Sequence, residues 1–577
     1  MYVNNAHYLF RIGMYSSFDG GQTWRDSGHL PVPDCATSSP PCSFPATITP
    51  ASCPGDGPFS DACKFTTSDV WLSFDDEGNV YAIVLVSPSS NTGTGWEMWM
   101  YKSTDGGRTW PLSNRRVIHD HILRNLSKAF LDDKDAIAVD NYTRATLPFR
   151  ANKPRDGNIG TIYACWGLDG TVAPTQTQVV SRSTDGGNTW GLSGIPFPVS
   201  QQNVREIGCQ IAIAPSGRVY VSFFVYGLAP SVAQYVTWSD DHGLTFSPIL
   251  KAADVNPVPN HLQDADNFRN LSLPAMAVSP TDSSVYVTWA DESTTDADIL
   301  LVKGTVTLLN GKEVGPPVFG NPIRVNQDAV GNVKDQFQPQ IAVTASGQID
   351  ISYFDRRQDP SNFFIDTYLS RSNTGGATWT DTRVTSKMSD PRINPPIDGA
   401  GNFFYGDYQG LVADDNCAMP FWNGTHLANL SPSDPNYSKW QEVFSARIPN
   451  GTRSCPTGGG ACHEADGDGE VQRMDAQGVH RAKFHFDKDK CEDGAAESVD
   501  VQDADAHTDF HSTQMSTVAF DDVLHTITVT GAGTNSGHSV NFTMVASDGI
   551  AGLGSFSLVL SDGYSVTGAL ISGLVEL

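Results

Sequence analysis

Apolar and polar positions alternate along most of the chain, and short turns interrupt the alternation. Residues 340–353 alternate around a Ser-Gly turn, and residues 210–223 have almost the same pattern. Alternation with a period of two is typical of strands that bury one face, and the turn makes each segment a hairpin. Related segments begin at Val70, Ala136, Ala275 and Gln409. Six hairpins therefore recur at intervals of roughly 65 to 70 residues, which indicates a repeat protein.

A second hairpin pattern interleaves with the first. Residues 183–190 read Ser-Thr-Asp-Gly-Gly-Asn-Thr-Trp, and related octapeptides begin at Ser17, Ser103, Ser239 and Ser372. An Asp carboxylate can accept backbone N–H bonds from the turn that follows it, and Gly supplies the positive φ of a tight turn. We therefore expect a structural role, rather than a catalytic one, for Asp19, Asp105, Asp185 and Asp241; the fifth copy has Thr374 instead.

Two hairpins per repeat give four strands, the unit of a β-propeller blade. Long amphipathic helical patterns are nearly absent, so the sequence predicts an all-β fold with a six-bladed β-propeller over residues 1–448. The hairpin Tyr8–Arg25 is expected to complete the blade that begins at Gln409 and so to close the ring. In the alternative, residues 441–448 already supply the third strand of that blade, and Tyr8–Arg25 is the remnant of a seventh blade.

The composition changes after Ile448. Residues 449–470 are rich in Gly and Asp and are expected to form a linker. Within them Asp466, Asp468 and Glu470 hint at a structural calcium ion, although the full calcium-loop pattern is missing. No other cofactor or metal site is expected. Strands alternate again over residues 471–577, which predicts a small β-sandwich domain.

The chain has 577 residues and a net charge of −27. This charge repels a phosphate backbone, so nucleic acid is not an expected partner. The charge also disfavours an anionic membrane surface, and no apolar run in the sequence is long enough to cross a bilayer, so membrane insertion is not expected.

Ten cysteines are present, and three close pairs lie in loops: Cys35 with Cys42, Cys53 with Cys63, and Cys455 with Cys462. These spacings lack the C-x-x-C pattern of zinc sites, so disulfides and an oxidising compartment are expected. Cys165 and Cys209 are a weaker further pair. Eight Asn-x-Ser/Thr sequons, Asn270 among them, matter only in a host that glycosylates such sites. We expect an extracellular protein, secreted or on the cell surface, although residues 1–5 lack the pattern of a signal peptide.

The five octapeptides resemble the Asp-box (BNR) repeat of the sialidase superfamily, over roughly residues 1–448. Residues 335–340, 353–357 and 406–411 look like a bacterial secreted subgroup that is described as sialidase-like, and the C-terminal part is similar to β-sandwich modules of bacterial secreted proteins. The resemblance implies a glycan or glycoprotein ligand. A sialidase of this family releases terminal sialic acid: three arginines hold the sugar carboxylate, a Tyr activated by Glu is the nucleophile, and an Asp is the acid/base.

Topology indicates where such residues would lie. The octapeptide turns and the Ser-Gly turns share one face of the propeller, so we expect a site on the opposite face, where the chain enters and leaves the inner strands. The candidate substrate arginines there are Arg205, Arg269, Arg356 and Arg357; Tyr408 is the candidate nucleophile, Glu206 its activating base, and Asp335 and Asp407 are further catalytic carboxylates. The same face carries Asp291, Glu292, Gln338, Arg392 and Tyr405. For each charge there, pairing with a neighbouring charge on the rim is the alternative.

Two functions remain open at this point. One is an exo-acting glycosidase of sialidase type, which converging arginines favour. The other is a non-catalytic propeller that binds a glycan or a protein, with the β-sandwich as an anchor. The first arginine of the family lies in a Phe/Tyr-Arg-Ile-Pro motif, and Phe10-Arg11-Ile12-Gly13 departs from it at the last position. This departure favours the binding protein.

Overall fold

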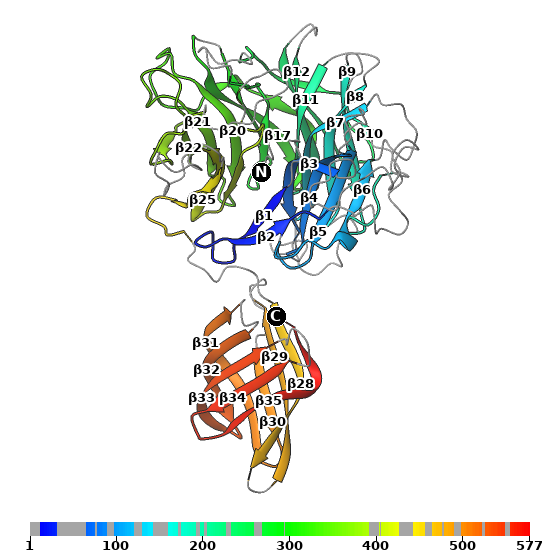
Figure 1. Ribbon diagram of the computed structural model, residues 1–577, viewed down its shortest axis with the longest axis vertical. Coiled ribbons are helices and arrows are strands. Elements are labelled where there is room, and N and C mark those ends of the chain that lie inside the picture. Colours follow the sequence, from blue (N-terminus) through cyan, green and yellow to red (C-terminus); the bar gives the residue numbers. More distant parts are fainter. Residues whose placement is uncertain are drawn as a thin grey trace, which may run out of the picture. The chain divides into compact units, whose positions relative to one another are not determined.

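The computed structural model of the chain is almost entirely β-structure (Figure 1). Along the chain it divides into two compact units, with the boundary between Cys455 and Pro456. Among the described residues, no helix is long and apolar enough to cross a membrane. The structure describes residues 12–31, 65–75, 78–88, 97–119, 130–141, 160–170, 175–191, 197–200, 205–226, 232–258, 268–292, 295–391, 403, 405–425, 442–455, 464–475, 478–489, 498–521, 526–547 and 554–576.

The first half of the larger unit contains three four-stranded antiparallel sheets, each in chain order. The first sheet contains β3 (Phe65–Phe74), β4 (Val80–Pro88), β5 (Glu97–Ser103) and β6 (Arg116–His119), with the 3-10 helix η3 (Leu112–Asn114) before β6. The second contains β7 (Phe130–Val139), β8 (Ile162–Gly170), β9 (Thr175–Ser183) and β10 (Phe197–Pro198). The third contains β11 (Arg205–Ile213), β12 (Val219–Tyr226), β13 (Ala233–Ser239) and β14 (Leu250–Asp254).

Three more sheets follow. The fourth contains β15 (Ala275–Val278), β16 (Val285–Asp291), β17 (Asp298–Leu309) and β18 (Lys312–Phe319), and β19 (Ile323–Arg324) also pairs with β17. The fifth contains β20 (Gln336–Val343), β21 (Ile349–Asp355), β22 (Asp366–Ser372) and β23 (Thr380–Arg383). The sixth contains β24 (Gly410–Ala413), β25 (Cys417–Gly424) and β26 (Glu442–Ser445), and β27 (Ile448–Pro449) also pairs with β25. These six sheets are the blades of a propeller, so the predicted six-bladed fold is confirmed.

The first strand of each blade lies innermost. β3 contacts β7, β7 contacts β11, β11 contacts β15, β15 contacts β20, and β20 contacts β24, so the first strands surround the axis. The second strands are buried along almost their whole length, as in β12, β16 and β21. Neighbouring blades pack on both faces of these strands, and a strand that is covered on both faces does not need polar alternation.

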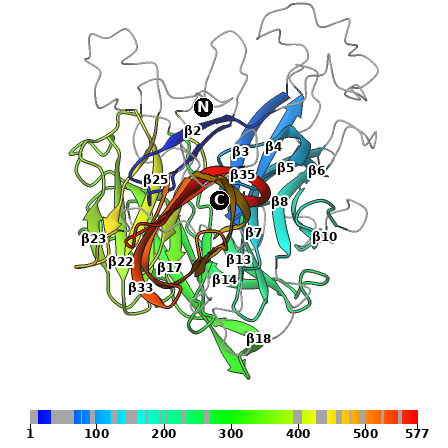
Figure 2. The same ribbon diagram turned by 90° about the horizontal axis from the view of Figure 1, so that it is seen from below.

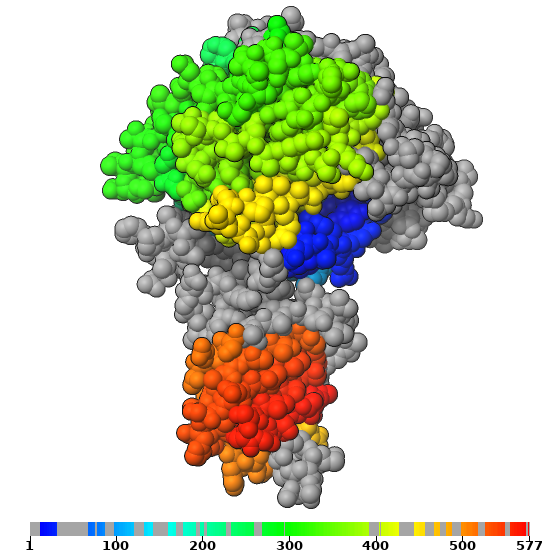
Figure 3. All heavy atoms as spheres, turned by 90° about the vertical axis from the view of Figure 1, so that its left-hand side faces the viewer, coloured from blue at the N-terminus to red at the C-terminus, as the bar shows by residue number. Residues whose placement is uncertain are grey.

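The N-terminal hairpin is placed differently from the first expectation. β1 (Gly13–Ser16) and β2 (Arg25–His29) form a separate two-stranded sheet, and within the described segments they add no strand to the sixth blade. Ile12, Met14 and Leu30 pack into a core with the first blade, while the Trp24 ring meets that of Phe421 in β25 at 5.5 Å. The hairpin thus lies between the last blade and the first (Figures 1 and 3). The third strand of the last blade is β26, within residues 441–448, as the alternative interpretation predicted.

Four of the octapeptides connect the third and fourth strands of blades, and the first connects β1 to β2. In the second copy, the Asp105 carboxylate accepts bonds from the Thr109 N–H at 2.9 Å, the Thr109 hydroxyl at 2.5 Å and the Ser103 hydroxyl at 2.6 Å. The Trp110 indole is buried and donates to the Gly107 carbonyl at 3.2 Å. The carboxylate and the indole therefore hold both sides of the turn. In the degenerate copy, the Thr374 hydroxyl accepts the Thr378 N–H at 2.9 Å in place of the carboxylate.

Two disulfides lie within the described residues. Cys165 of β8 and Cys209 of β11 join the second and third blades, with a Cα–Cα distance of 6.2 Å, which confirms that pair. Cys455 bonds to Cys417 of β25 and not to Cys462, so the expectation for that loop pair is wrong. The fold brings together cysteines that are 38 residues apart. Cys35, Cys42, Cys53, Cys63 and Cys462 lie outside the described residues. Disulfides are typical of proteins that fold in an oxidising compartment.

The smaller unit is the second all-β module that the sequence predicts. It contains β28 (Glu464–Asp475), β29 (Gly478–Asp489), β30 (Ser498–Asp503), β31 (Thr508–Asp521), β32 (Thr526–Asn535), β33 (His538–Ser547), β34 (Ser555–Leu560) and β35 (Ser565–Glu576). β28 pairs with β35, so the two faces of the expected sandwich belong to one closed sheet (Figure 2). The Phe484 and Phe556 rings stack at 4.0 Å inside it. A Cβ at Gly531 would lie 2.1 Å from the Gln514 carbonyl oxygen, so the irregular pairing of β31 with β32 at this place requires glycine.

The segment expected as a linker, residues 449–470, is shorter than predicted. Pro449 still pairs with β25, Cys455 is tied to the same strand, and β28 begins at Glu464. Asp466, Asp468 and Glu470 therefore lie in a paired strand rather than in a loop. In the described part of the chain, no three His, Cys, Asp or Glu residues are grouped so as to hold a metal ion.

Candidate functional site

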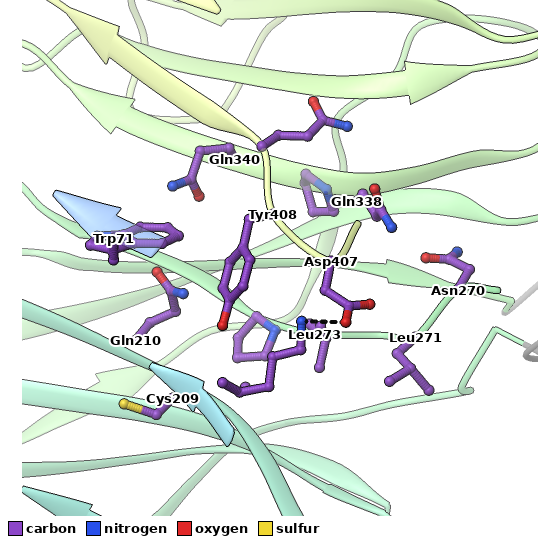
Figure 4. A pocket seen from close by; sticks show the side chains of 15 residues that line it. Trp71, Cys209, Gln210, Asn270, Leu271, Leu273, Gln338, Gln340, Asp407 and Tyr408 are labelled. Atoms are coloured by element: carbon purple, nitrogen blue, oxygen red, sulfur yellow. Dashed lines mark ion pairs between the residues drawn. The ribbon is translucent and has the colours of Figure 1, made fainter. Parts of the chain in front are cut away.

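A pocket lies on the propeller axis, and all six blades contribute to it (Figure 4). Its residues come from the first strands or from the segments just before them. They are Trp71, Lys134, Gly208, Cys209, Gln210, Asn270, Leu271, Leu273, Pro274, Gln338, Pro339, Gln340, Asp407, Tyr408 and Gln409. Figure 4 shows Asp407 and Tyr408 side by side in the pocket, with Trp71 on one side and Asn270 on the other.

Bulges in the inner strands shape this pocket. The pairing of β3, β7, β11 and β20 with their neighbours shifts register at the same place in each blade. Asp69, Lys134 and Gln338 adopt positive φ at these shifts, with values of 38°, 56° and 50°, and Gly208 does so in β11. Positive φ in a non-glycine residue costs about 1–3 kcal/mol and is concentrated at functional sites. The bulges interrupt the regular alternation and turn side chains toward the axis.

An ion-pair network lies at the centre. The Asp407 carboxylate contacts the Lys134 ammonium at 2.8 Å and the Arg269 guanidinium at 3.0 Å. Lys134 and Asp407 are almost completely buried, whereas the Arg269 side chain is 32% exposed. Removing a buried charge from such a network leaves its partners uncompensated. One carboxylate is therefore shared by two cations, Lys134 in the pocket and Arg269 beside it.

Tyr408 lies beside this network. Its ring has the Lys134 ammonium at 4.2 Å from its centroid and meets the Trp71 ring edge-on at 5.7 Å. Its hydroxyl donates to the Asp135 carboxylate at 3.3 Å. Burial and the neighbouring carboxylates of Asp69 and Asp135 raise the pKa of Tyr408 well above its ordinary value. The surroundings thus oppose formation of a phenolate.

Three more acidic residues, Asp69, Asp133 and Asp135, lie next to pocket residues without lining the pocket themselves, and two of them have raised pKa values. Burial, with the Asp69 charge as the next cause, raises the pKa of Asp133 to about 6. The charge of Asp407 raises it further, whereas Lys134 and Arg269 lower it. Burial likewise raises the pKa of Asp135 well above its ordinary value. A carboxyl group that stays protonated near neutral pH can act as a general acid.

The pocket also holds amide groups without hydrogen-bond partners among the described residues. Asn270 is completely buried, and neither its Oδ1 nor its Nδ2 has a partner. Gln409 is 9% exposed, and its Oε1 and Nε2 are both unpaired. The Gln338 amide donates to the Gly406 carbonyl at 3.0 Å, but its Oε1 has no partner. Because Asn270 has no exposed surface, this sequon is closed to glycosylation in the folded protein.

Of the residues proposed from the sequence, Asp407, Tyr408 and Gln338 line this pocket, and Arg269 pairs with Asp407 beside it. Glu206 lies elsewhere, against the second blade, where its backbone carbonyl accepts the Gln178 amide at 2.9 Å. Burial raises the pKa of Glu206 to about 7. The carboxylate that meets the Tyr408 hydroxyl is Asp135 rather than Glu206. Arg205 is exposed at the start of β11 and does not line the pocket.

The remaining candidates are engaged inside the fifth blade and its neighbours. Arg356 has no exposed surface; its guanidinium donates to the Asn362 carbonyl at 3.1 Å and lies over the Phe337 ring. The Asp335 carboxylate accepts the Asn362 amide at 2.7 Å and is 3.9 Å from Arg356. Arg357 pairs with two carboxylates at 2.7 Å each, those of Asp355 and Asp381.

These contacts correct the expected arginine trio, because Arg356 is part of the core and Arg205 is away from the pocket. The alternative of pairing with a neighbouring charge holds for Arg357, whereas Asp291 accepts the Trp289 indole at 2.9 Å. Tyr405 is buried and donates to Thr425 at 3.4 Å. Arg11 and Arg392 lie outside the described residues, and Glu292 does not line the pocket.

Sequence reasoning missed Asp69, Trp71, Asp133, Lys134, Asp135 and Asn270. The sequence did contain a signal for these residues. The recurring hairpins begin at Val70, Ala136, Gln210, Ala275, Gln340 and Gln409, and the pocket residues lie at these starts or in the few residues before them. Asp133-Lys-Asp135 stands where Gly406-Asp-Tyr408 stands in the sixth repeat. The residues at which each repeat departs from its pattern are therefore those that face the axis.

Comparison with known proteins gives structural likeness only. A Hadza microbial sialidase, Hz136, aligns with a TM-score of 0.38 at 13% identity over 66% of this chain and 66% of its own length, slightly under two thirds of that protein. An α-L-arabinanase of Penicillium chrysogenum aligns with a TM-score of 0.37 at 12% identity over 66% of this chain and 93% of its own. A leech intramolecular trans-sialidase aligns with a TM-score of 0.36 at 11% identity over 67% of this chain and 68% of its own.

No protein-family model matches the chain, and no curated protein matches it.

Proposed function

We propose that this propeller is a glycoside hydrolase whose reaction centre is the axial pocket. The observation that carries the proposal is a pair of carboxyl groups in opposite electrostatic settings. Asp133 is a carboxyl group whose pKa is raised to about 6, while Asp407 is a carboxylate in contact with two cations. Glycoside hydrolysis uses this division of roles, with one protonated carboxyl and one ionised carboxylate.

The roles follow from the chemistry of the bond. Asp133 gives its proton to the glycosidic oxygen as the bond from that oxygen to the anomeric carbon breaks. Asp407, next to Lys134 and Arg269, is the ionised partner. It either attacks the anomeric carbon or takes a proton from the attacking water. In the first case water attacks the glycosyl–Asp407 ester, supplies the new hydroxyl and gives its other proton to Asp133. In the second case water supplies the hydroxyl, its proton goes to Asp407, and exchange with solvent returns a proton to Asp133.

A sialidase-type reaction would use Tyr408 as the nucleophile. Burial and four surrounding carboxylates, those of Asp69, Asp135, Asp133 and Asp407, raise its pKa well above the ordinary value. This environment favours a neutral phenol. We therefore assign Tyr408 to the wall of the pocket, where its ring and hydroxyl position the sugar, and we assign the bond cleavage to carboxylates.

A panel of 4-nitrophenyl glycosides tests the proposal. We expect turnover of at least one member and, for Asp407→Asn, a loss of kcat of about 10²- to 10⁴-fold. Because Asp133 acts while protonated, kcat/KM should fall as pH rises above about 6. Asp254→Asn is the matched control, since Asp254 is exposed and pairs with Lys251 outside the pocket.

Asp407 belongs to a buried network, so Asp407→Asn could lower stability; its melting temperature must be measured beside its turnover. Asp133→Asn is the second variant, because the Asp133 side chain makes none of the ion pairs of that network. If no glycoside is hydrolysed by the folded wild-type protein while sugars still bind in the pocket, the proposal falls and the protein is a binding propeller.

A further inference from the structure

We infer that the pocket accepts a neutral, polyhydroxylated sugar unit, recognised by side-chain amides, and that it rejects sugars that carry a carboxylate. This inference rests on the hydrolase function proposed above and names its substrate class. Three features of the pocket carry it: unpaired amides, an apolar wall and the local charge.

The unpaired amides are the first feature. Asn270 and Gln409 each present one donor and one acceptor group in the pocket, and none of these four atoms has a partner among the described residues. Leaving a buried polar group unsatisfied costs about 1–3 kcal/mol. A ligand with several hydroxyls can supply the missing partners. A hydroxyl is both donor and acceptor, so it matches an amide side chain without any charge.

The apolar wall is the second feature. Leu271, Leu273 and Pro274 come from the segment before β15, and the Trp71 ring comes from β3. A sugar ring has C–H groups on its faces and hydroxyls around its edge. An apolar wall next to amides matches both surfaces. Figure 4 shows Trp71 and Leu271 on different sides of Asp407 and Tyr408.

The local charge is the third feature. Lys134 and Arg269 both contact Asp407, and Asp69, Asp133 and Asp135 lie around them, so two cations are surrounded by four acidic residues. Asp69, Asp133 and Asp135 lie close enough to raise the pKa of Tyr408 as well. A substrate carboxylate would have to compete with the Asp407 carboxylate for Lys134 and Arg269, and Asp407 would repel it. Like charges that are forced together are a means of rejecting a ligand.

The experiment separates binding from turnover. Methyl glycosides of neutral pentoses and hexoses, N-acetylneuraminic acid and glucuronic acid are titrated by calorimetry, and the matching 4-nitrophenyl glycosides are assayed. We expect at least one neutral sugar to bind and to be hydrolysed, and no acidic sugar to do either. Asn270→Ala and Gln409→Ala should each weaken the Kd or raise the KM of the neutral sugar by about tenfold. Gln502→Ala, an exposed amide of the barrel, is the control.

A stability measurement distinguishes recognition from a structural role. Removing an unpaired buried amide deletes a cost of folding, so Asn270→Ala should leave the melting temperature unchanged or raise it. Two results overturn the inference: turnover or binding of an acidic sugar in preference to every neutral one, or unchanged binding in both amide variants. If neutral sugars bind through Asn270 but are not hydrolysed, the inference is supported and the proposed hydrolase function is wrong. Absence of both binding and turnover would overturn both.

Discussion

Two groups of aspartates in the propeller, those of the octapeptide turns and those around the axial pocket, have surroundings with opposite effects on the carboxyl pKa. In the turn, burial opposes the charge of Asp105, but bonds from Ser103 and Thr109 hold its pKa below the ordinary value. At the axis, burial and neighbouring charge raise the pKa of Asp133 to about 6. The turns stabilise the ionised form and gain stability from it. The pocket destabilises the ionised form and keeps a proton available.

This contrast also concerns the repeat itself. Each octapeptide Asp lies inside a repeated pattern, whereas Asp133 and Asp407 lie at its irregular ends. The octapeptide residues, which recur in four of the six blades, serve the fold, because these blades share the same turn. Residues that differ between blades at one equivalent place meet at the axis, where a single asymmetric site requires different side chains.

The sharpest test of the contrast compares Asp133→Asn with Asp105→Asn on two substrates. With a leaving group of high pKa, Asp133→Asn should reduce kcat by about 10²- to 10⁴-fold, since the departing oxygen needs a proton. With dinitrophenol as the leaving group, which departs without protonation, most of the activity should remain. Asp105→Asn should leave both rates unchanged. Equal losses of Asp133→Asn on both substrates would rule out the acid role.

The second prediction concerns stability: substitutions of Asp133 and Asp105 should change the free energy of unfolding in opposite directions. The pKa of Asp133 is about 6 in the folded protein, above its ordinary value of 3.8. The contribution of Asp133 to the free energy of unfolding is therefore greatest below pH 3.8 and is lost as pH rises through about 6. Asp133→Asn removes this cost and should raise the free energy of unfolding at pH 7 by up to about 3 kcal/mol. Urea titrations at pH 7 and pH 4 measure it; the gain should shrink at pH 4, and a loss at pH 7 would contradict the electrostatic account.

Much of the fold could be predicted from the sequence, and the reason is repetition. Six copies of one hairpin and five of another fix the strands, their order and the blade count. The place of the N-terminal hairpin could not be fixed, because both arrangements satisfy the same strand pattern. The placement of the hairpin depends on contacts between residues that are distant in sequence, such as Trp24 and Phe421.

The candidate site was predictable only in part. Arg269, Asp407 and Tyr408 were found from topology, which places blade-to-blade segments at the axis. Arg356 was misplaced, because strand alternation does not show whether a charged side chain turns inward; here it is stacked against Phe337. Lys134 was missed since its direction depends on a bulge with φ of 56°, and a bulge reverses the alternation on which such reasoning rests.

The third prediction uses the degenerate copy as a natural control. Asp105→Ala removes an acceptor for Thr109 and should lower the free energy of unfolding by about 1–3 kcal/mol. Asp105→Thr should cost less than half as much, because the Thr374 hydroxyl already performs this role for Thr378 in the fifth copy. Chemical denaturation of the two variants measures the difference. Equal losses would show that the hydrogen bond is not what stabilises the turn, and a loss of turnover at full stability would give the octapeptide a catalytic role.

The smallest effect is the pH dependence of that same turn, and its sign is opposite to that of Asp133. The pKa of Asp105 is below its ordinary value of 3.8 in the folded protein. Its ionised carboxylate therefore contributes stability above the unfolded value, and this contribution is lost as pH falls through the folded pKa. Asp105→Thr has no group to titrate there, so the stability gap between wild type and this variant should narrow as pH falls from 7 to below 3.8. The narrowing should be about half a kcal/mol, because solvent screens a partly exposed carboxylate. A gap that stays constant with pH would mean that the turn uses the carboxylate only as a hydrogen-bond acceptor, whatever its charge.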